Sequence, residues 1–544
     1  PLAVDAEHPF PFISSDALNL VVTLPLEAAE GDRIVRIKVP DNRPRWVPLR
    51  GGGGFVPLEA VIAANLDLLF PTTPPESVFP FRVTRGVKGA QDALRDLSPE
   101  EARREPGSVV RQVSSELKAR RFAGVVRLEV ADGTPAELCE WLASQLGLND
   151  EDLYPTRTLL RLSDLDDLEA GNRPHLKLPA HKPRTHPRLR DLPMTPSAIF
   201  DEVRRGDVLF HHPYHDFDTS VLRFIESAAA DPDTLAIKLT IYRTSKDSPI
   251  VQALAQAARR GKQVAVLVEI TARFDEAPNI AWGRFLEDEG VHVAYGVEKL
   301  KTHVKGALVV REEAGHIRRY AHVGTGNYHT GTARIYEDLG ILTCDPEICA
   351  DMADVFNVLT GATHRVEYQQ LLVAPVTMRP RFLELIRQEA EHARAGREAG
   401  IRAKVNQLQD RETIEELYRA SQAGVPIETI VRGLCCLRPG VPGLSESIQI
   451  YSVLGRFLEH SRIYRFANGG DPLYFIGSAD WMKRNLSRRV ETIMPVFDPS
   501  IQRELDEILD VYASDNSSAW DAGPDGSYVR RHPAPGEPRR AAQE

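Results

Sequence analysis

A histidine and a lysine two residues apart stand at the start of an apolar stretch in the middle of the chain. His303 and Lys305 precede the apolar residues 307–310, and the glycine-rich turn GTGN follows at 324–327. Residues two apart on a strand share a face, so both side chains are expected on one side of a strand. An imidazole can act as a nucleophile, and an ammonium group and the free N–H groups of a turn can hold an anion. These residues together suggest phosphate chemistry; the alternative is a surface strand with an incidental histidine and lysine.

The same order of parts recurs in the last third of the chain. A lysine, an arginine, a histidine and a small turn follow one another twice: Lys238, Arg273, His303 and 324–327, then Lys404, Arg432, His460 and 477–480. An acidic residue also follows each turn at the same spacing, Asp338 in the first copy and Glu491 in the second. Internal repetition of this kind indicates a duplicated structural unit. We therefore expect two domains of one fold, with His303 and His460 facing each other across one cleft.

Alternating strand and helix patterns surround the first copy. The patterns predict strands at 234–242, 263–270 and 291–295 and helices at 250–260 and 280–289. Such alternation indicates a largely parallel sheet with both faces covered, and ligands of such sheets bind at the carboxyl ends of the strands. Arg243 stands at the end of the first strand and Arg273 just past the second. Both are therefore expected at the same edge as His303.

The chain before this region has α+β character. Its predicted strands are 18–23, 33–39 and 124–130, and its predicted helices are 58–69 and 109–121. Repeated prolines between 174 and 196 exclude a continuous helix and indicate an extended, locally basic linker. The predicted domains are a head at 1–185 that ends in this linker, a first α/β domain at 186–370, and a second at 371–544 with a disordered C-terminal tail.

The overall composition excludes several classes of protein. A chain of 544 residues is too long for one core, and the net charge of −10 argues against a general nucleic-acid binder. No run of about 18 apolar residues or signal peptide is present. The five cysteines lack CxxC spacing, which gives no support for a zinc site and suits a reducing cytoplasm. The chain begins with Pro1, which suggests a fragment.

The duplicated histidine and turn motifs resemble those of the phospholipase D superfamily. Longer strings are similar to the bacterial, long-chain, phosphohistidine type of polyphosphate kinase: IYRTSKDSPIV (241–251), ARFDEAPNI (272–280), LKTHVK (300–305) and GSADWMKRN (477–485). The resemblance covers essentially the whole chain. It implies two tandem phospholipase D-like α/β domains preceded by an α+β head domain. It also implies a helical N-terminal domain that would precede Pro1.

The resemblance gives roles to residues of both copies. His303 matches the phosphorylated histidine and is the expected nucleophile, and Lys305 would bind phosphoryl oxygens. His460 is the expected general acid and also contacts nucleotide phosphate. Tyr336 matches a tyrosine that stacks on adenine, and Arg432 is expected to bind the nucleotide as well.

A magnesium site is implied at Arg243 and Arg273. A guanidinium group cannot ligate a cation, so we expect the two arginines to hold phosphate oxygens that in turn carry Mg²⁺. Weaker candidates for lining the cleft are Lys238, Lys404, Asn327 and Asp480. The histidines of FHHPYHDF at 210–217 are expected to form a structural loop, because their spacing is interrupted by proline and suits a closed metal site poorly.

The favoured function is reversible transfer of the terminal phosphate of ATP to inorganic polyphosphate, which yields ADP and a chain one unit longer. ATP, ADP and polyphosphate are the expected partners, nucleic acid is not, and a homodimer or homotetramer in the cytoplasm is expected. No transmembrane segment is expected, and peripheral membrane association stays open. Two alternatives remain: a phospholipase D-like phosphodiesterase or nuclease, and a non-catalytic protein that binds polyanions. A P-loop kinase is disfavoured because no GxxxxGK[ST] motif is present.

Overall fold

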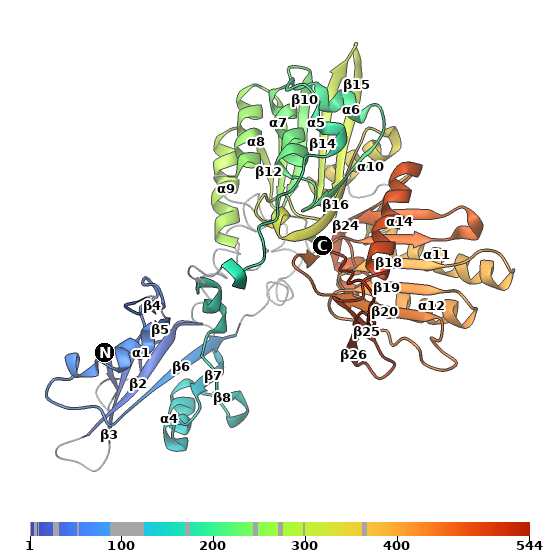
Figure 1. Ribbon diagram of the computed structural model, residues 1–544. Coiled ribbons are helices and arrows are strands. Elements are labelled where there is room, and N and C mark those ends of the chain that lie inside the picture. Colours follow the sequence, from blue (N-terminus) through green and yellow to red (C-terminus); the bar gives the residue numbers. More distant parts are fainter. Residues whose placement is uncertain are drawn as a thin grey trace, which may run out of the picture. The chain divides into compact units, whose positions relative to one another are not determined.

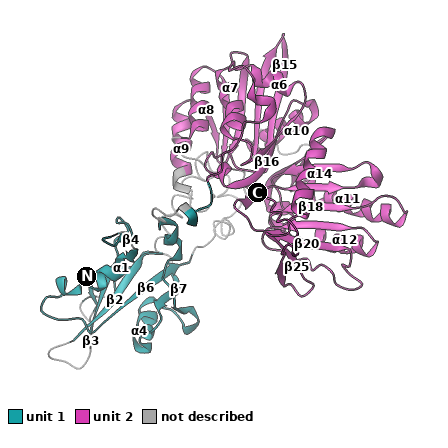
Figure 2. Ribbon diagram, viewed as in Figure 1, with its two compact units in different colours: residues 1–179 teal, residues 180–544 magenta. Residues whose placement is uncertain are grey.

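The computed structural model describes residues 2–4, 8, 10–25, 32–51, 54–86, 124–168, 174–242, 248–269, 276–296, 300–361 and 367–544. Within the chain, two compact units are distinguished, residues 1–179 and 180–544 (Figure 2). Arg243, Arg273 and the helix expected at 109–121 lie outside the described residues.

Unit 1 is built on a six-stranded sheet in the order β1-β3-β2-β6-β7-β8 (Figure 1). The strands are β1 (Leu2–Val4), β2 (Leu18–Pro25), β3 (Asp32–Lys38), β6 (Ser77–Arg85), β7 (Val125–Ala131) and β8 (Leu153–Thr156), and β4 (Trp46–Pro48) pairs separately with β5 (Phe55–Pro57). Val21 of β2 packs in a core with α4 (Ala136–Leu146), whereas Val22 packs in a second core with residues of α1 (Leu58–Ala63). Because neighbouring residues of a strand point to opposite faces, the sheet is covered on both sides. The expected α+β head is confirmed.

The first half of unit 2 has a mixed sheet in the order β12-β11-β10-β14-β15-β16-β21, with β9 also paired to β16. Its own strands are β9 (Val208–His212), β10 (Thr234–Ile241), β11 (Gln263–Val268), β12 (His292–Ala294), β14 (Gly306–Glu313), β15 (His316–Gly324) and β16 (Tyr336–Thr343). Its α-helices are α5 (Pro187–Arg190), α6 (Ala198–Val203), α7 (Arg223–Ala230), α8 (Pro249–Arg259), α9 (Glu276–Asp288) and α10 (Pro346–Leu359).

The expectation of a largely parallel sheet is wrong for four of these seven strands. The strands β10, β11 and β12 are parallel, but β14, β15, β16 and β9 pair antiparallel. For β14 and β15 the cause is the connection between them, a two-residue turn at Ala314 and Gly315 with φ angles of 50° and 79°. Such a turn forms a hairpin, whereas parallel neighbours need a crossover of a dozen or more residues.

The second half of unit 2 repeats this arrangement in a sheet of order β13-β24-β23-β22-β18-β19-β20-β25-β26, with β17 beside β24. Its own strands are β17 (Leu372–Ala374), β18 (Ile401–Val405), β19 (Ile427–Val431), β20 (Ile448–Val453), β22 (Ile463–Phe466), β23 (Leu473–Gly477) and β24 (Arg489–Pro495). The helices are α11 (Met378–Arg394), α12 (Arg411–Gln422), α13 (Lys483–Arg488) and α14 (Pro499–Ala513). As in the first half, three parallel strands (β18, β19, β20) continue into antiparallel ones.

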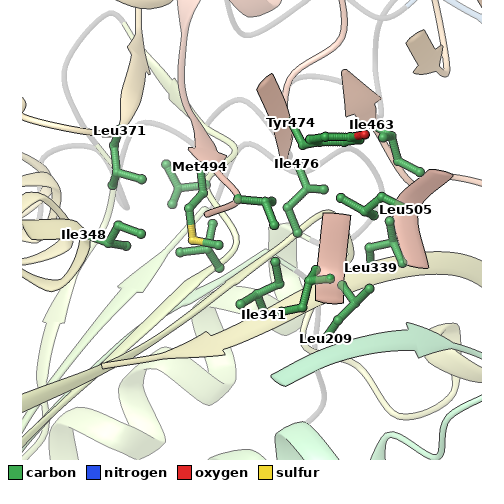
Figure 3. Close-up of a cluster of buried hydrophobic side chains, with 14 of the residues drawn as sticks. Leu209, Leu339, Ile341, Ile348, Leu371, Ile463, Tyr474, Ile476, Met494 and Leu505 are labelled. Carbon is green, nitrogen blue, oxygen red and sulfur yellow. The ribbon is translucent and has the colours of Figure 1, made fainter. Parts of the chain in front are cut away.

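The two halves of unit 2 share one hydrophobic core (Figure 3). Ile341 and Ile348 come from the first half, and Ile476, Met494 and Leu505 come from the second. Each is less than about 1% exposed, and burial of one such side chain contributes about 1.5–3 kcal/mol. This core holds the facing edges of the two sheets together.

The residues after α14 do not form the disordered tail that we expected. Instead β25 (Ala519–Ala522) extends the second sheet beside β20, and β26 (Tyr528–Arg530) pairs with β25. In Figure 1 the end of the chain lies between the two halves of unit 2. Among the helices of the described ranges, none is long and apolar enough to cross a membrane.

Candidate active site

His303 is positioned by a strand that joins the sheet of the other half. The two-residue strand β13 (Lys301–Thr302) pairs in parallel with β24 of the second half. The pairing continues for one more residue, since the N–H of His303 donates to the carbonyl oxygen of Val490 over 2.9 Å. The next residue of β24 is Glu491, and its Oε2 lies 2.9 Å from Nδ1 of His303.

His460 is positioned in the same way from the opposite side. The two-residue strand β21 (Leu458–Glu459) pairs in parallel with β16 of the first half. The N–H of His460 donates to the carbonyl oxygen of Glu337 over 3.0 Å. Asp338 follows, and its Oδ1 lies 2.7 Å from Nδ1 of His460. Each half of unit 2 therefore supplies the carboxylate for the histidine of the other half.

The environment of His303 favours a neutral imidazole. Burial lowers the pKa of His303 well below its usual value, and the nearby positive charges of Lys305, Arg489 and Arg462 lower it further. With Nδ1 facing Glu491, the ring proton is assigned to Nδ1, and the lone pair of Nε2 stays available. Burial raises the pKa of Glu491 to about 7, and Arg489, whose Nη1 is 3.6 Å from Oε1, opposes that rise.

Lys305 does not lie on a strand beside His303 as expected. Residues 303–305 connect β13 to β14, and the Nζ of Lys305 donates back to the carbonyl oxygen of His303 over 2.6 Å. Lys305 is 1% exposed. Its pKa is lowered to about 7, mainly by burial and also by Arg462 and Arg489, against the opposing effect of Glu491 and Asp338. Its amino group therefore gains or loses a proton near neutral pH.

Arg462 is the counterpart of Lys305 in the second copy. Its Nη1 donates to the carbonyl oxygen of His460 over 2.6 Å, the same bond that Lys305 makes to His303. Its Nε lies 3.2 Å from Oδ1 of Asp480. Asp480, which we expected to line the cleft, is thus the partner of a buried arginine.

The turn GTGN supports a carboxylate rather than offering free N–H groups. The N–H groups of Gly324 and Thr325 donate to Lys305 and Leu339 of the backbone. The hydroxyl of Thr325 donates to Oδ1 of Asp338 over 2.6 Å. A Cβ on Gly326 would lie 2.4 Å from Oδ2 of the same aspartate, so glycine is needed there for close approach. The proposed anion-binding role of this turn is wrong for its first two residues.

The expected nucleotide-binding residues gather around His460. The ring of Tyr336 lies 5.3 Å from that of His460, at an interplanar angle of 58°. Arg432 follows the carboxyl end of β19, and its Nη1 donates to the carbonyl oxygen of Glu459 over 2.7 Å. Burial and the charge of Arg462 lower the pKa of Arg432. Arg243 and Arg273 lie outside the described residues.

Two of the weaker candidates do not line the cleft. Lys404 is 1% exposed and forms ion pairs with Glu337 (2.6 Å) and Glu459 (2.7 Å). Lys238 donates to Oδ1 of Asn357 on α10. Lys238 and Lys404 were chosen because they occupy equivalent positions in the two copies. Such a position does not indicate whether the side chain faces the cleft or is buried against other residues.

The histidines at 211, 212 and 215 are engaged within the protein. Nε2 of His211 lies 2.7 Å from Oε1 of Glu337, Nδ1 of His212 bonds to the carbonyl oxygen of His215, and Nδ1 of His215 accepts from the N–H of His211. In the described part of the chain, no group of three or more His, Cys, Asp or Glu side chains is arranged to hold a metal ion.

Three residues near His303 were not selected from the sequence. The ring of Tyr242 lies 5.6 Å from that of His303 at 85°, with Nζ of Lys305 5.4 Å from the tyrosine ring. Arg489 and Arg484 add positive charge, and the charge of Arg489 helps burial to lower the pKa of Arg484. In the sequence, the basic string KRNLSRR at 483–489 could have indicated the two arginines.

The chain matches three family models that together span most of its length. The polyphosphate kinase middle domain matches residues 1–168, C-terminal domain 1 matches 198–365, and C-terminal domain 2 matches 371–543. Two relatives named polyphosphate kinase are those of Thermosynechococcus vestitus (49% identity, 99% of this chain and 76% of that protein) and Streptomyces coelicolor (48%, 100% and 72%). The crystal structure of polyphosphate kinase from Porphyromonas gingivalis superposes with a TM-score of 0.85 at 32% identity, over 100% of this chain and 78% of the other.

Proposed function

The chain belongs to the polyphosphate kinase family, and we propose that His303 carries the phosphoryl group between ATP and polyphosphate. The enzyme is an ATP–polyphosphate phosphotransferase. Of the three functions that the sequence left open, the family therefore supports the kinase over the phosphodiesterase and the non-catalytic binding protein. The observation that supports His303 is its bond to Glu491, which leaves Nε2 as the free nucleophilic atom.

In the first step, Nε2 of His303 attacks the terminal phosphorus of ATP. The N–P bond forms while the bond from that phosphorus to the bridging oxygen breaks, and ADP leaves with the oxygen. The imidazole gains positive charge as this happens. Glu491, whose pKa is raised to about 7, is suited to accept the Nδ1 proton.

In the second step, a terminal oxygen of polyphosphate attacks the same phosphorus. The N–P bond breaks, the chain becomes one phosphate longer, and His303 regains its neutral form once Glu491 returns the proton. The reverse sequence makes ATP from ADP. Both directions use the same groups, since phosphoryl transfer depends on positioning and on neutralising charge.

The positive charges near His303 fit a substrate that carries several negative charges. Lys305, Arg462, Arg484 and Arg489 surround Glu491 and His303. The charge on a bound phosphate would raise the pKa of Lys305 again, because an opposite charge favours the ammonium form. The site is thereby most positive when substrate is present.

Mg²⁺ is expected to bind oxygens of the nucleotide and polyphosphate phosphates. The carboxylates of the site already have protein partners: Asp338 and Glu491 are hydrogen-bonded to the two histidines, and Asp480 forms an ion pair with Arg462. In such sites the ion usually keeps waters and binds substrate phosphates. When bound, it neutralises phosphate charge; Arg243 and Arg273 would hold other phosphate oxygens.

His460, Tyr336 and Arg432 are proposed to bind the nucleotide. Burial holds the pKa of His460 below its usual value although Asp338 opposes this. Phosphate charge would raise it and let His460 donate a proton or a hydrogen bond to the leaving oxygen. The face of Tyr336 would receive the base. A homodimer or homotetramer and a cytoplasmic location stay predictions.

Labelling with ATP that carries an isotope in its terminal phosphate tests the proposal. Acid-labile label on the protein is expected, and His303→Ala should abolish it. A phosphodiesterase would instead hydrolyse a diester substrate with no transfer to polyphosphate.

A further inference from the structure

The end of the chain is tied back to the segment that follows α14. The side chain of Asn516 accepts from the N–H of Arg540 over 2.8 Å and donates to the carbonyl oxygen of Pro538 over 3.1 Å. The hydroxyl of Ser517 donates to the carbonyl oxygen of Arg540, and the N–H of Ala542 donates to Asp515 over 2.7 Å. These bonds fix where the following residue, Gln543, is placed.

Gln543 uses its whole amide group on the segment that leads to His460. Its Oε1 accepts from the N–H of Phe457 over 2.6 Å, and its Nε2 donates to the carbonyl oxygen of Phe457 over 2.9 Å. Nε2 also donates to the carboxylate of Glu459. The side chain is 8% exposed. One acceptor and both donors of an amide are thus satisfied by residues 457–459.

Gly455 leaves the space that this contact needs. A Cβ at position 455 would lie 2.3 Å from Oε1 and 2.6 Å from the amide carbon of Gln543. The glycine does not have a positive φ angle, so the backbone itself would accept alanine. Alanine at this position would therefore act by displacing Gln543.

The segment held by Gln543 is the one that sets the position of His460. Glu459 is the last residue of β21, whose pairing with β16 delivers His460 to Asp338. The carboxylate of Glu459 also accepts from Lys404 and from the hydroxyl of Tyr512 (2.6 Å). Gln543 adds the contact that binds the backbone just before this strand.

We propose that Gln543 is a positioning residue for His460. It reaches no reacting atom itself; it holds residues 457–459 so that the imidazole keeps its place at Asp338 and beside Tyr336. The kinetic part of this inference rests on the proposed role of His460. The C-terminal segment is then part of the active site's support rather than an appendage.

The first test is Gln543→Ala in the full chain. Hydrogen exchange measured by mass spectrometry should rise in peptides that cover 455–460 and stay unchanged in those that cover 300–305. Gln422→Ala is the matched control, because it removes a hydrogen bond from a glutamine side-chain amide to the carbonyl oxygen of Gly443 on an exposed surface. Unchanged exchange at 455–460 would overturn the proposal, whatever the role of His460.

The second test is kinetic. Gln543→Ala should lower kcat/KM for ATP about ten-fold, in the range seen when a group that orients an active-site side chain is lost. In a His460→Ala background the same change should have little further effect, because Gln543 acts through that histidine. Fully additive losses would overturn the proposal. An unimpaired His460→Ala enzyme would instead refute the role proposed for His460 and leave the exchange result standing.

Gly455→Ala supplies the third test without removing Gln543. It should reproduce the kinetic loss of Gln543→Ala, and it should cost little more in the Gln543→Ala background, where the collision is absent. A Gly455→Ala enzyme with wild-type kcat/KM and wild-type exchange would contradict the inferred contact.

Discussion

The carboxylate of Glu491 lies 2.9 Å from Nδ1 of His303, although the two residues belong to different halves of unit 2. Asp338 and His460 repeat the relationship in the opposite direction at 2.7 Å. Each histidine is thus fixed by a contact that exists only when the two halves are packed together. Separation of the halves would remove both carboxylates from their histidines at once.

Glu491→Gln tests the importance of that carboxylate to His303. Glutamine keeps the size but cannot accept the Nδ1 proton as the N–P bond forms. We expect the rate of protein labelling by ATP to fall about 10- to 100-fold, measured by rapid quenching. Glu384→Gln, which removes a charge from an exposed ion pair with Arg381, should leave the rate unchanged. An equal rate in Glu491→Gln would refute a role for the ionised carboxylate.

At ATP concentrations well below KM, where the rate reports the pKa values of the free enzyme, the labelling rate should depend on pH in a bell shape centred near 7. Below the raised pKa of Glu491, about 7, the carboxyl is protonated and cannot accept a proton, so the rate falls as the pH falls. Above the lowered pKa of Lys305, also about 7, the ammonium charge is lost, so the rate falls as the pH rises. His303 stays neutral across this range because its own pKa lies well below the usual value.

Glu491→Gln should also remove the acidic limb of that profile, while the alkaline limb persists and moves to lower pH because Glu491 no longer raises the pKa of Lys305. Single-turnover labelling from about pH 5 to about pH 9 measures both limbs. An acidic limb that persists in the variant would assign it to another group.

Tyr336 should determine how well the base of the nucleotide is held. Tyr336→Ala is expected to raise KM for ATP about ten-fold or more, since stacking of an aromatic ring on a base contributes about 1–3 kcal/mol. Tyr336→Phe keeps the ring and should stay near the wild type. Equal KM values for the alanine and wild-type enzymes would exclude stacking on this residue.

Lys404 is predicted to act on stability. Lys404→Met would leave Glu337 and Glu459 buried without their cation, which costs about 3–5 kcal/mol of unfolding free energy. Denaturant unfolding of the full chain measures the loss. Arg411→Met, which removes an exposed ion pair with Glu415, should cost much less, because solvent screens that pair. Comparable losses in the two variants would contradict the buried network.

The sequence predicted the parallel part of the first sheet of unit 2 closely, because periodicity reports burial. The strand expected at 234–242 is β10 (Thr234–Ile241), and the helix expected at 250–260 is α8 (Pro249–Arg259). The antiparallel strands were not anticipated, because an apolar run looks the same in either direction. The two-residue turn at Ala314 and Gly315 was the overlooked signal.

The repeat in the sequence indicated that His303 and His460 are equivalent, but not how they are held. β13 and β21 are two residues long and carry no periodicity. From the sequence, Asp338 and Glu491 could therefore be recognised only as acidic residues that recur at the same spacing, and not as the partners of the two histidines. The position of Gln543 could not be predicted either. It contacts Phe457, 86 positions earlier in the chain, and the residues around Gln543 have few apolar side chains that would indicate packing. The roles of Arg243 and Arg273 stay predictions.

The assignment of His303 as the nucleophile is tested most directly by labelling with ATP that carries an isotope in its terminal phosphate. The wild-type chain, His303→Ala and His460→Ala are incubated with it, and the label is mapped to peptides. We predict acid-labile label on the peptide that contains His303 in the wild type, a slower rate of the same labelling in His460→Ala, and none in His303→Ala. Acid-labile label that persists in His303→Ala, or that maps to His460 in the wild type, would contradict the assignment.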